Sequence, residues 1–193
     1  MTKKTSKYDK ILNTFIQLLI EGGYQSATIS KIAERAEVNP STIFRNFTDK
    51  KGLLSAVVDR HLKDLSTIFD GVSMTGNIED DLVILSKTYQ EFQVDHQEIV
   101  LIGFQAALEM PEINKAVEEI PVLFKKILGD YFSDMKKQHK IRETIDVEAA
   151  TMNLLWLNFG YFLSVIRFDH PNISTSATDF YDKQIRFFAK SLV

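Results

Sequence analysis

Apolar side chains recur along most of the chain at intervals of three and four residues, which places them on one face of an α-helix. No stretch shows the strict apolar and polar alternation of a half-buried strand. We therefore expect an all-α fold of about nine helices, with Pro121 either dividing or kinking the seventh. The spacing predicts helices over residues 8–20, 29–36, 40–47, 49–69, 78–94, 99–109, 112–139, 147–168 and 179–192.

The helical period breaks sharply between residues 29–36 and 40–47. Asn39 is a good N-cap at this point, because its side-chain oxygen can accept a hydrogen bond from the first free backbone N–H groups. Pro40 follows where a first helical residue needs no N–H of its own. A new helix therefore starts at Pro40 after a turn of about three residues, which is the layout of a helix-turn-helix.

The second of these two helices has one apolar and one polar face. Ile43 and Phe47 lie four residues apart on the same side, so we expect Phe47 in particular to be part of the core. A helix that presents small polar groups and one Arg is typical of a recognition helix in the major groove of DNA. The side chains that face outwards here are Ser41, Thr42, Arg45 and Asn46.

The whole stretch from residue 28 to residue 50 resembles the DNA-binding signature of TetR-type transcriptional regulators. In that signature a Thr opens the second helix, Ile-Ala stands inside it, and the third helix ends aromatic-x-x-Phe ahead of a Lys. The matching residues are Thr28, Ile32, Ala33, Ala36, Val38, Ser41, Thr42, Ile43, Phe44, Phe47, Lys50, Leu53 and Leu54.

The chain departs from this signature at four positions. Glu37 stands where the family usually has Gly, so either a left-handed backbone is strained there or the turn is built differently. Asn39 replaces the usual Ser, which keeps the cap. Phe44 replaces a Tyr that often reaches the DNA backbone, and Asn46 replaces a His or Tyr.

The resemblance implies a DNA-binding surface on the second and third helices. Thr28 can cap its helix, and its hydroxyl and the adjacent N–H groups can also bind a phosphate. Arg45 can bond guanine bidentately or contact phosphate alone, and Lys50 is expected to anchor a phosphate. Carried over residue by residue, the DNA-binding positions are Thr28, Asn39, Pro40, Ser41, Thr42, Phe44, Arg45, Asn46 and Lys50.

Charge is distributed unevenly along the chain. Residues 1–63 carry 11 Lys and Arg against 6 Asp and Glu, whereas the other 130 residues carry 12 against 20, for a net charge of −3. A basic head on an acidic body directs the head towards a polyanion such as DNA. Any chain that is divided in two shows some imbalance, so the charge supports DNA binding only together with the motif.

The composition excludes several other classes of protein. No Cys is present, which rules out disulfides and thiolate-bound zinc and agrees with a reducing cytoplasm. The four His are scattered, and the densest group of possible metal ligands, residues 95–98, fits a solvated turn better than a metal site. No continuous run of 18 or more apolar residues and no signal peptide occurs. We expect a soluble cytoplasmic protein that is not an enzyme, enters no membrane and holds no metal or cofactor.

The resemblance also implies how the chain is divided and what its larger part binds. We expect a DNA-binding domain over residues 1–47 and a ligand-binding and dimerisation domain over residues 48–193. TetR-like bodies enclose a small-molecule pocket, although aromatic residues at helical spacing are more often plain core. The expected effector-pocket residues are Tyr89, Phe92, Phe104, Leu108, Phe124, Leu128, Trp156 and Phe159, with Tyr89, Asn158 and Gln105 as possible polar groups.

Residues 149–166 are too apolar on all sides for a helix that faces solvent. They either lie deep in the monomer or meet another chain, and a two-fold partner that pairs the last two helices of each subunit is our preferred hypothesis. A second copy also doubles the DNA contacts of one short helix. The expected interface residues are Leu154, Tyr161, Val165, Phe180 and Phe188.

These inferences lead to one preferred function and one alternative. The resemblance implies a sequence-specific regulator, most simply a repressor that leaves its double-stranded DNA operator when a lipophilic or aromatic small molecule binds. The alternative is a TetR-like DNA-binding architectural or protein-partner module that has no small-molecule effector.

Overall fold

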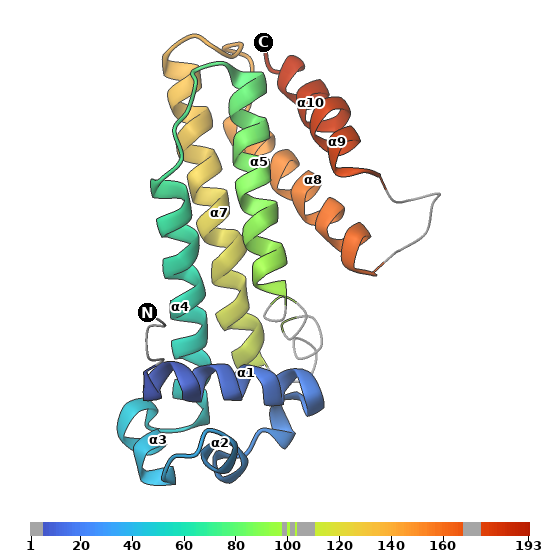
Figure 1. Ribbon diagram of the computed structural model, residues 1–193. Coiled ribbons are helices and arrows are strands. Elements are labelled where there is room, and N and C mark those ends of the chain that lie inside the picture. Colours follow the sequence, from blue (N-terminus) through green and yellow to red (C-terminus); the bar gives the residue numbers. More distant parts are fainter. Residues whose placement is uncertain (1–5, 98–99, 101–102, 104–110, 168–174) are drawn as a thin grey trace, which may run out of the picture. The chain divides into compact units, whose positions relative to one another are not determined.

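The computed structural model describes residues 6–97, 100, 103, 111–167 and 175–193, with backbone alone at 111–117 and 167. All regular elements in these ranges are helices, which confirms the all-α fold (Figure 1). They are α1 (Lys7–Ser26), α2 (Ile29–Arg35), α3 (Pro40–Phe47), α4 (Lys50–Asp70), α5 (Ile78–Asp95), α7 (Pro111–Lys137), α8 (Val147–Arg167), α9 (Ala177–Asp179), η1 (Phe180–Ile185) and α10 (Arg186–Lys190). The helix expected over 99–109 lies outside the described residues.

The chain forms two compact units. One comprises residues 1–63 and 96–119, and the other comprises residues 64–95 and 120–193. The first half of α4 therefore groups with the N-terminal helices, beyond the expected division at residue 47. That division concerns function, and it remains a prediction.

The N-terminal unit is built on a small apolar core. In Figure 1, α1 lies across α2 and α3, and the ring of Tyr8 on α1 lies 4.8 Å from the ring of Phe47 on α3. The first helix was expected over residues 8–20, and Gly23, three residues later, leaves the helical conformation with φ +73°. The chain resumes a helical turn to Ser26, whose hydroxyl donates to the Gly23 carbonyl. The fully buried core side chains include Ile11, Leu12, Phe15, Ile32 and Ile43.

The second unit packs α5, α7, α8 and the C-terminal helical run around a larger core. The helix α7 is continuous through Pro121, so of the two alternatives for this segment the structure has one helix. At the other end of the unit, the Arg186 guanidinium on α10 pairs with Asp80 on α5 at 2.9 Å. The fully buried side chains of this core include Leu82, Leu85, Phe92, Phe124, Leu128, Phe132 and Phe162.

The C-terminal helix contains a π-helical segment over Phe180–Ile185 between two α-helical pieces. The apolar spacing of the sequence predicts an ordinary α-helix here and carries no sign of the wider turn. The ring of Phe180 is fully buried and stacks on that of Tyr161 in α8, with centroids 4.0 Å apart. π-Helical turns are rare overall, but those that occur are often at functional sites, so this segment is a candidate binding region.

The helix α8 is unusually apolar. By length and composition alone, Val147–Ile166 could cross a membrane, with a mean hydropathy of 1.3. A core helix of a soluble protein meets the same criterion, and α8 packs against α5 and η1. It also carries the fully buried Asn158, whose amide donates to the Ser86 hydroxyl at 3.1 Å and accepts from Gln90 Nε2 at 3.2 Å. Only 33% of this apolar window is buried, so packing inside the subunit covers one side of α8 and leaves apolar side chains exposed on the other.

A buried carboxylate holds the connection between α4 and α5. Asp81 is fully buried and accepts hydrogen bonds from the backbone N–H groups of Thr75 and Gly76, from the Thr75 hydroxyl and from the Tyr131 hydroxyl on α7. Burial and the nearby carboxylate raise the pKa of Tyr131 well above its ordinary value, so the phenol keeps the proton that it donates. Four donors on one carboxylate fix the loop and tie it to α7.

We predict that Asp81→Asn lowers the free energy of unfolding by about 2–4 kcal/mol, because an amide nitrogen would face donors that have no acceptor left. Tyr131→Phe removes one of the four hydrogen bonds and should cost about 1 kcal/mol. Urea unfolding followed by circular dichroism measures both values. Equal losses in the two variants would contradict a central role for the carboxylate.

Candidate nucleic-acid interface

The helix α3 is placed by its two ends and by two buried side chains. At its start the Asn39 side chain accepts from the Ser41 N–H at 2.9 Å, and Pro40 is the first helical residue, as the sequence predicts. Ile43 is fully buried and Phe47 is 5% exposed. One face of an eight-residue helix is thereby fixed to the core, and the other faces outwards.

The predicted DNA-binding residues lie together on the outward side of α2 and α3. Thr28 caps α2, its hydroxyl accepting from the Lys31 N–H at 3.3 Å. In the described part of the chain, the exposed guanidinium of Arg45 has no hydrogen bond or ion pair, which leaves all its donors available. Phe44 is 52% exposed. Asn39, Pro40, Ser41 and Asn46 are also exposed, and Thr42 is half-buried.

The turn between α2 and α3 has a left-handed residue. Glu37 has φ +54°, in the region that favours glycine, so of the two alternatives for this turn the structure has the strained left-handed one. The Val38 N–H closes the turn by donating to the Ala33 carbonyl at 2.9 Å. The Lys10 ammonium pairs with the Glu37 carboxylate at 2.5 Å, and this hydrogen bond lowers the pKa of Glu37.

Lys50 has a more structural position than the sequence suggested. Its ammonium donates to the Tyr24 carbonyl at 2.8 Å and lies 4.0 Å from the centre of the Tyr24 ring. Partial burial lowers the pKa of Lys50. One of its three N–H donors is therefore already committed to its own chain, and a phosphate contact through Lys50 remains a prediction.

Two other basic side chains near the helix-turn-helix are held in ion pairs. Arg35 binds Glu21 through two nitrogens at 2.5 and 2.7 Å, and Lys10 binds Glu37. Lys31, next to the start of α2, is exposed, and its ammonium has no partner among the described residues. Lys31 belongs with Arg45 as an available cation on this surface. Lys31 is not among the DNA-binding residues expected from the TetR-type signature.

The residues expected to line an effector pocket lie in different environments. Tyr89 and Phe124 stack with ring centroids 3.6 Å apart, and Phe92 and Leu128 are fully buried, so these four are packed core. Burial raises the pKa of Tyr89 well above its ordinary value. Trp156 lies on the surface, 57% exposed, instead of inside the body. Phe159 is half-buried, and Phe104, Leu108 and Gln105 lie outside the described residues.

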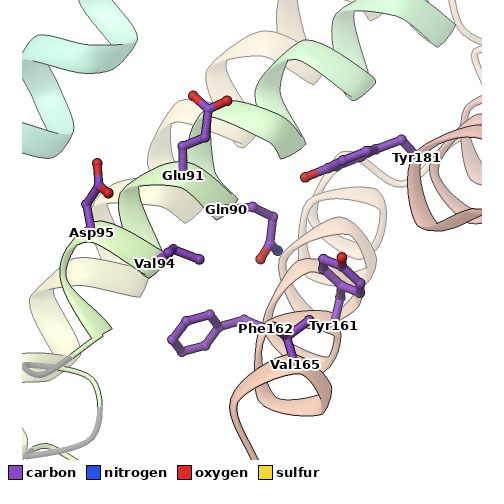
Figure 2. A pocket seen from close by; sticks show the side chains of 8 residues that line it. All are labelled: Gln90, Glu91, Val94, Asp95, Tyr161, Phe162, Val165 and Tyr181. Atoms are coloured by element: carbon purple, nitrogen blue, oxygen red, sulfur yellow. The ribbon is translucent and has the colours of Figure 1, made fainter. Parts of the chain in front are cut away.

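A hollow of about 370 Å³ lies between other residues of the same helices. Figure 2 shows Tyr161, Phe162 and Val165 of α8 on one side, with Gln90, Glu91, Val94 and Asp95 of α5 opposite and Tyr181 of η1 at the edge. Asn158, considered as a polar group for a ligand, is instead bonded within the core to Ser86 and Gln90.

The residues expected at a dimer interface are mostly occupied within their own subunit. Leu154 and Phe180 are fully buried, which leaves them no surface for a partner, and Tyr161 and Val165 line the hollow described above. Phe188 is half-buried and lines a second hollow, of about 580 Å³, together with Trp156 and the 75% exposed Phe187. Among the described residues of α8 and the C-terminal helices, the large apolar side chains that are open to a partner include Trp156, Phe187 and the 51% exposed Val165.

The chain is similar to known transcriptional regulators, both in its N-terminal part and over nearly its full length. Residues 11–57 match the family described as bacterial regulatory proteins of the tetR family. The chain is 28% identical over 183 residues to the uncharacterized HTH-type transcriptional regulator YvkB of Bacillus subtilis (strain 168), with 95% of each protein covered.

Two solved structures have a similar fold. One is a TetR-family transcriptional regulator from Syntrophomonas wolfei, with a TM-score of 0.76 and 16% identity over 96% of this chain and 93% of that one. The other is the transcriptional regulator FadR from Bacillus subtilis in complex with stearoyl-CoA, with a TM-score of 0.69 and 16% identity over 95% of this chain and 94% of that one.

We predict that Glu37→Gly raises Tm by about 2–4 °C, because glycine adopts the left-handed turn without steric cost. Lys10→Ala is the control, since it removes the exposed ion pair and leaves the backbone unchanged. Differential scanning calorimetry measures both variants. A lower Tm for Glu37→Gly, with Lys10→Ala unaltered, would show that the turn is not strained.

Proposed function

The chain belongs to the TetR family of transcriptional regulators, and we propose that it is a repressor that binds its operator as a homodimer and leaves it when a small molecule binds. The observation that carries this proposal is the outward face of α3, which presents Ser41, Arg45 and Asn46 while Ile43 and Phe47 hold the helix in place. A cytoplasmic location follows from the same role.

In this proposal α3 enters the major groove. Arg45 bonds the O6 and N7 acceptors of guanine, and the ring of Pro40 and the methyl of Thr42 contact thymine methyl groups. Thr28 and the N-terminus of α2 bind phosphate, with Lys31 as a further phosphate contact. Because phosphate contacts release counterions, affinity falls as salt rises, and base contacts determine the sequence preference.

A dimer is supported by an exposed stripe on α8. Ala149, Asn153, Trp156 and Gly160 follow one another at intervals of three and four residues, so they share one face, and all four are exposed. A side chain added at Gly160 would meet no atom within 4 Å, which means that the surface there is open. Trp156 and Phe187 supply the large apolar groups that such an interface needs.

A ligand acts in this proposal by changing which dimers fit the operator. In the dimer, two DNA-binding domains about one helical turn apart bind two half-sites. A ligand that binds better to dimers in which these domains lie at a different distance lowers the fraction of dimers that can bind DNA. The helix α4 starts directly after α3 and continues into the larger unit, which makes it the covalent link for this change. The pocket between α5, α8 and η1 is the proposed ligand site.

We predict that Arg45→Lys keeps non-specific DNA binding but reduces the preference for the operator by about 10–100-fold, because an ammonium cannot bond guanine bidentately. Arg45→Ala should lower the salt dependence as well. Fluorescence anisotropy with DNA from upstream of the protein's own coding sequence measures both. If neither variant alters the preference, Arg45 does not read bases. If the wild-type chain shows no sequence preference, the regulator proposal fails.

We predict that Gly160→Arg yields a folded monomer. The added side chain has room in the isolated subunit and removes an unfavourable helical glycine, but it blocks a partner on the α8 stripe. Sedimentation velocity gives the mass, and the emission of Trp156, the single Trp, should shift to the red when its interface is lost.

The control for this experiment is Asp130→Arg, which places the same side chain on an exposed position of α7 and should leave the dimer intact. A dimeric Gly160→Arg variant with unchanged Trp156 emission would show that the subunits meet elsewhere or not at all.

A further inference from the structure

The pocket between α5, α8 and η1 has a rigid apolar side. Phe162 is fully buried, and Gln90 is 5% exposed with its amide nitrogen 2.7 Å from the Asn158 carbonyl. The ring of Tyr161 stacks on the buried Phe180, which limits its movement. The second aromatic ring, Tyr181, has its centroid 6.4 Å from that of Tyr161 and lies in the π-helical segment. These side chains form a preorganised aromatic surface.

The charged groups that line the same pocket are all negative. Glu91 and Asp95 lie four residues apart on α5, and both are exposed. Neither has an ion-pair partner within the described ranges of the chain. In Figure 2 their carboxylates lie on the α5 side and point away from Phe162 and Val165, so they stand at the outer rim of the pocket and not inside it. Among the residues that the structure describes, no Lys, Arg or His lines the pocket.

The pKa of Tyr181, at the edge of the pocket, is affected by burial and by these charges. Burial, with smaller contributions from Tyr161 and from the charge of Glu91, raises the pKa of Tyr181 to about 12. The phenol therefore stays neutral at ordinary pH. The ammonium of Lys87 lies 5.3 Å from the centre of the Tyr181 ring, and Lys87 is not among the described lining residues.

We propose that this pocket binds a small organic cation that carries aromatic or other apolar groups. Tyr161 and Tyr181 present π-faces, which attract cations, and Phe162, Val94 and Val165 bury the apolar part. Glu91 and Asp95 supply the opposite charge at the rim. This inference rests on the proposed function, because it gives the chemical class of the effector of that same site.

The proposed ligand differs in charge from the ligand in a solved structure of similar fold. The solved structure of FadR from Bacillus subtilis contains stearoyl-CoA, whose phosphate groups are negative. Such groups would meet two carboxylates at the rim here, with no basic residue in the described part of the lining. The shared fold therefore does not carry the ligand class over to this chain.

Tetraphenylphosphonium and tetraphenylborate form a sharp pair of probes, because the two ions have nearly the same shape and opposite charge. We expect isothermal titration calorimetry in sodium buffer to show that the full-length protein binds the phosphonium at least about tenfold more tightly than the borate. Stearoyl-CoA is the third probe. Stronger binding of the borate or of stearoyl-CoA at this pocket would overturn the proposal.

The variant Glu91→Gln/Asp95→Asn should weaken phosphonium binding by about tenfold, because both charges at the rim are lost. The variant Asp130→Asn/Asp134→Asn is a matched control, since it removes two exposed carboxylates at the same spacing on α7 and should leave binding unchanged. Equal weakening in both variants would mean that overall charge is responsible, and no weakening in either would also overturn the assignment.

DNA release is measured separately, by anisotropy of operator DNA in the presence of each probe. If phosphonium binding depends on Glu91 and Asp95 but DNA stays bound at saturation, the ligand class is correct and the ligand-released repressor is wrong. If stearoyl-CoA releases DNA and the phosphonium does not bind, the repressor function stands and the cation assignment is wrong.

Discussion

The burial of Ile43 and Phe47 is the contact on which the rest of the account depends. An eight-residue helix such as α3 is not stable alone in water, so its position is determined by these two side chains and by the Asn39 cap. Glu37 takes a left-handed conformation in the turn so that α3 can leave α2 at the required angle. The backbone strain at Glu37 is confined to the turn. The result is that the polar face of α3 points outwards, including Arg45, which is unpaired in the described chain.

The helix α8 meets two demands with opposite faces. On one side Asn158, Phe162 and Leu154 are buried, and Asn158 joins α8 to Gln90 and Ser86 of α5. On the other side Trp156 and Gly160 remain open. In the proposed dimer this open side would be covered, so that α8 packs once in its own subunit and once against a partner. The proposal thereby explains why a helix that is only partly buried in its own subunit is apolar all round.

The sequence predicted the DNA-binding end well because caps and turns are local. The conformation of each cap and turn residue depends on a few sequence neighbours, so one short segment contains the signal for it. These residues are Thr28, Glu37, Asn39 and Pro40. The body was harder. When a helix is apolar on all sides, its sequence pattern does not show which face is buried. Trp156 was therefore expected in the interior, and Leu154 and Phe180 at a surface. The π-helical turn and the bond from Lys50 to Tyr24 depend on distant packing, which spacing does not encode.

Directed cleavage of DNA tests the central claim most directly, that two copies present α3 to one operator. Because the chain has no Cys, Asn46→Cys introduces a single thiol at the end of α3, to which an iron chelate can be attached. The account predicts two clusters of strand cleavage about one helical turn apart, symmetric about the operator centre. A single cluster, or cleavage that is no stronger than that from the same chelate on α7 at Asp130→Cys, would contradict it.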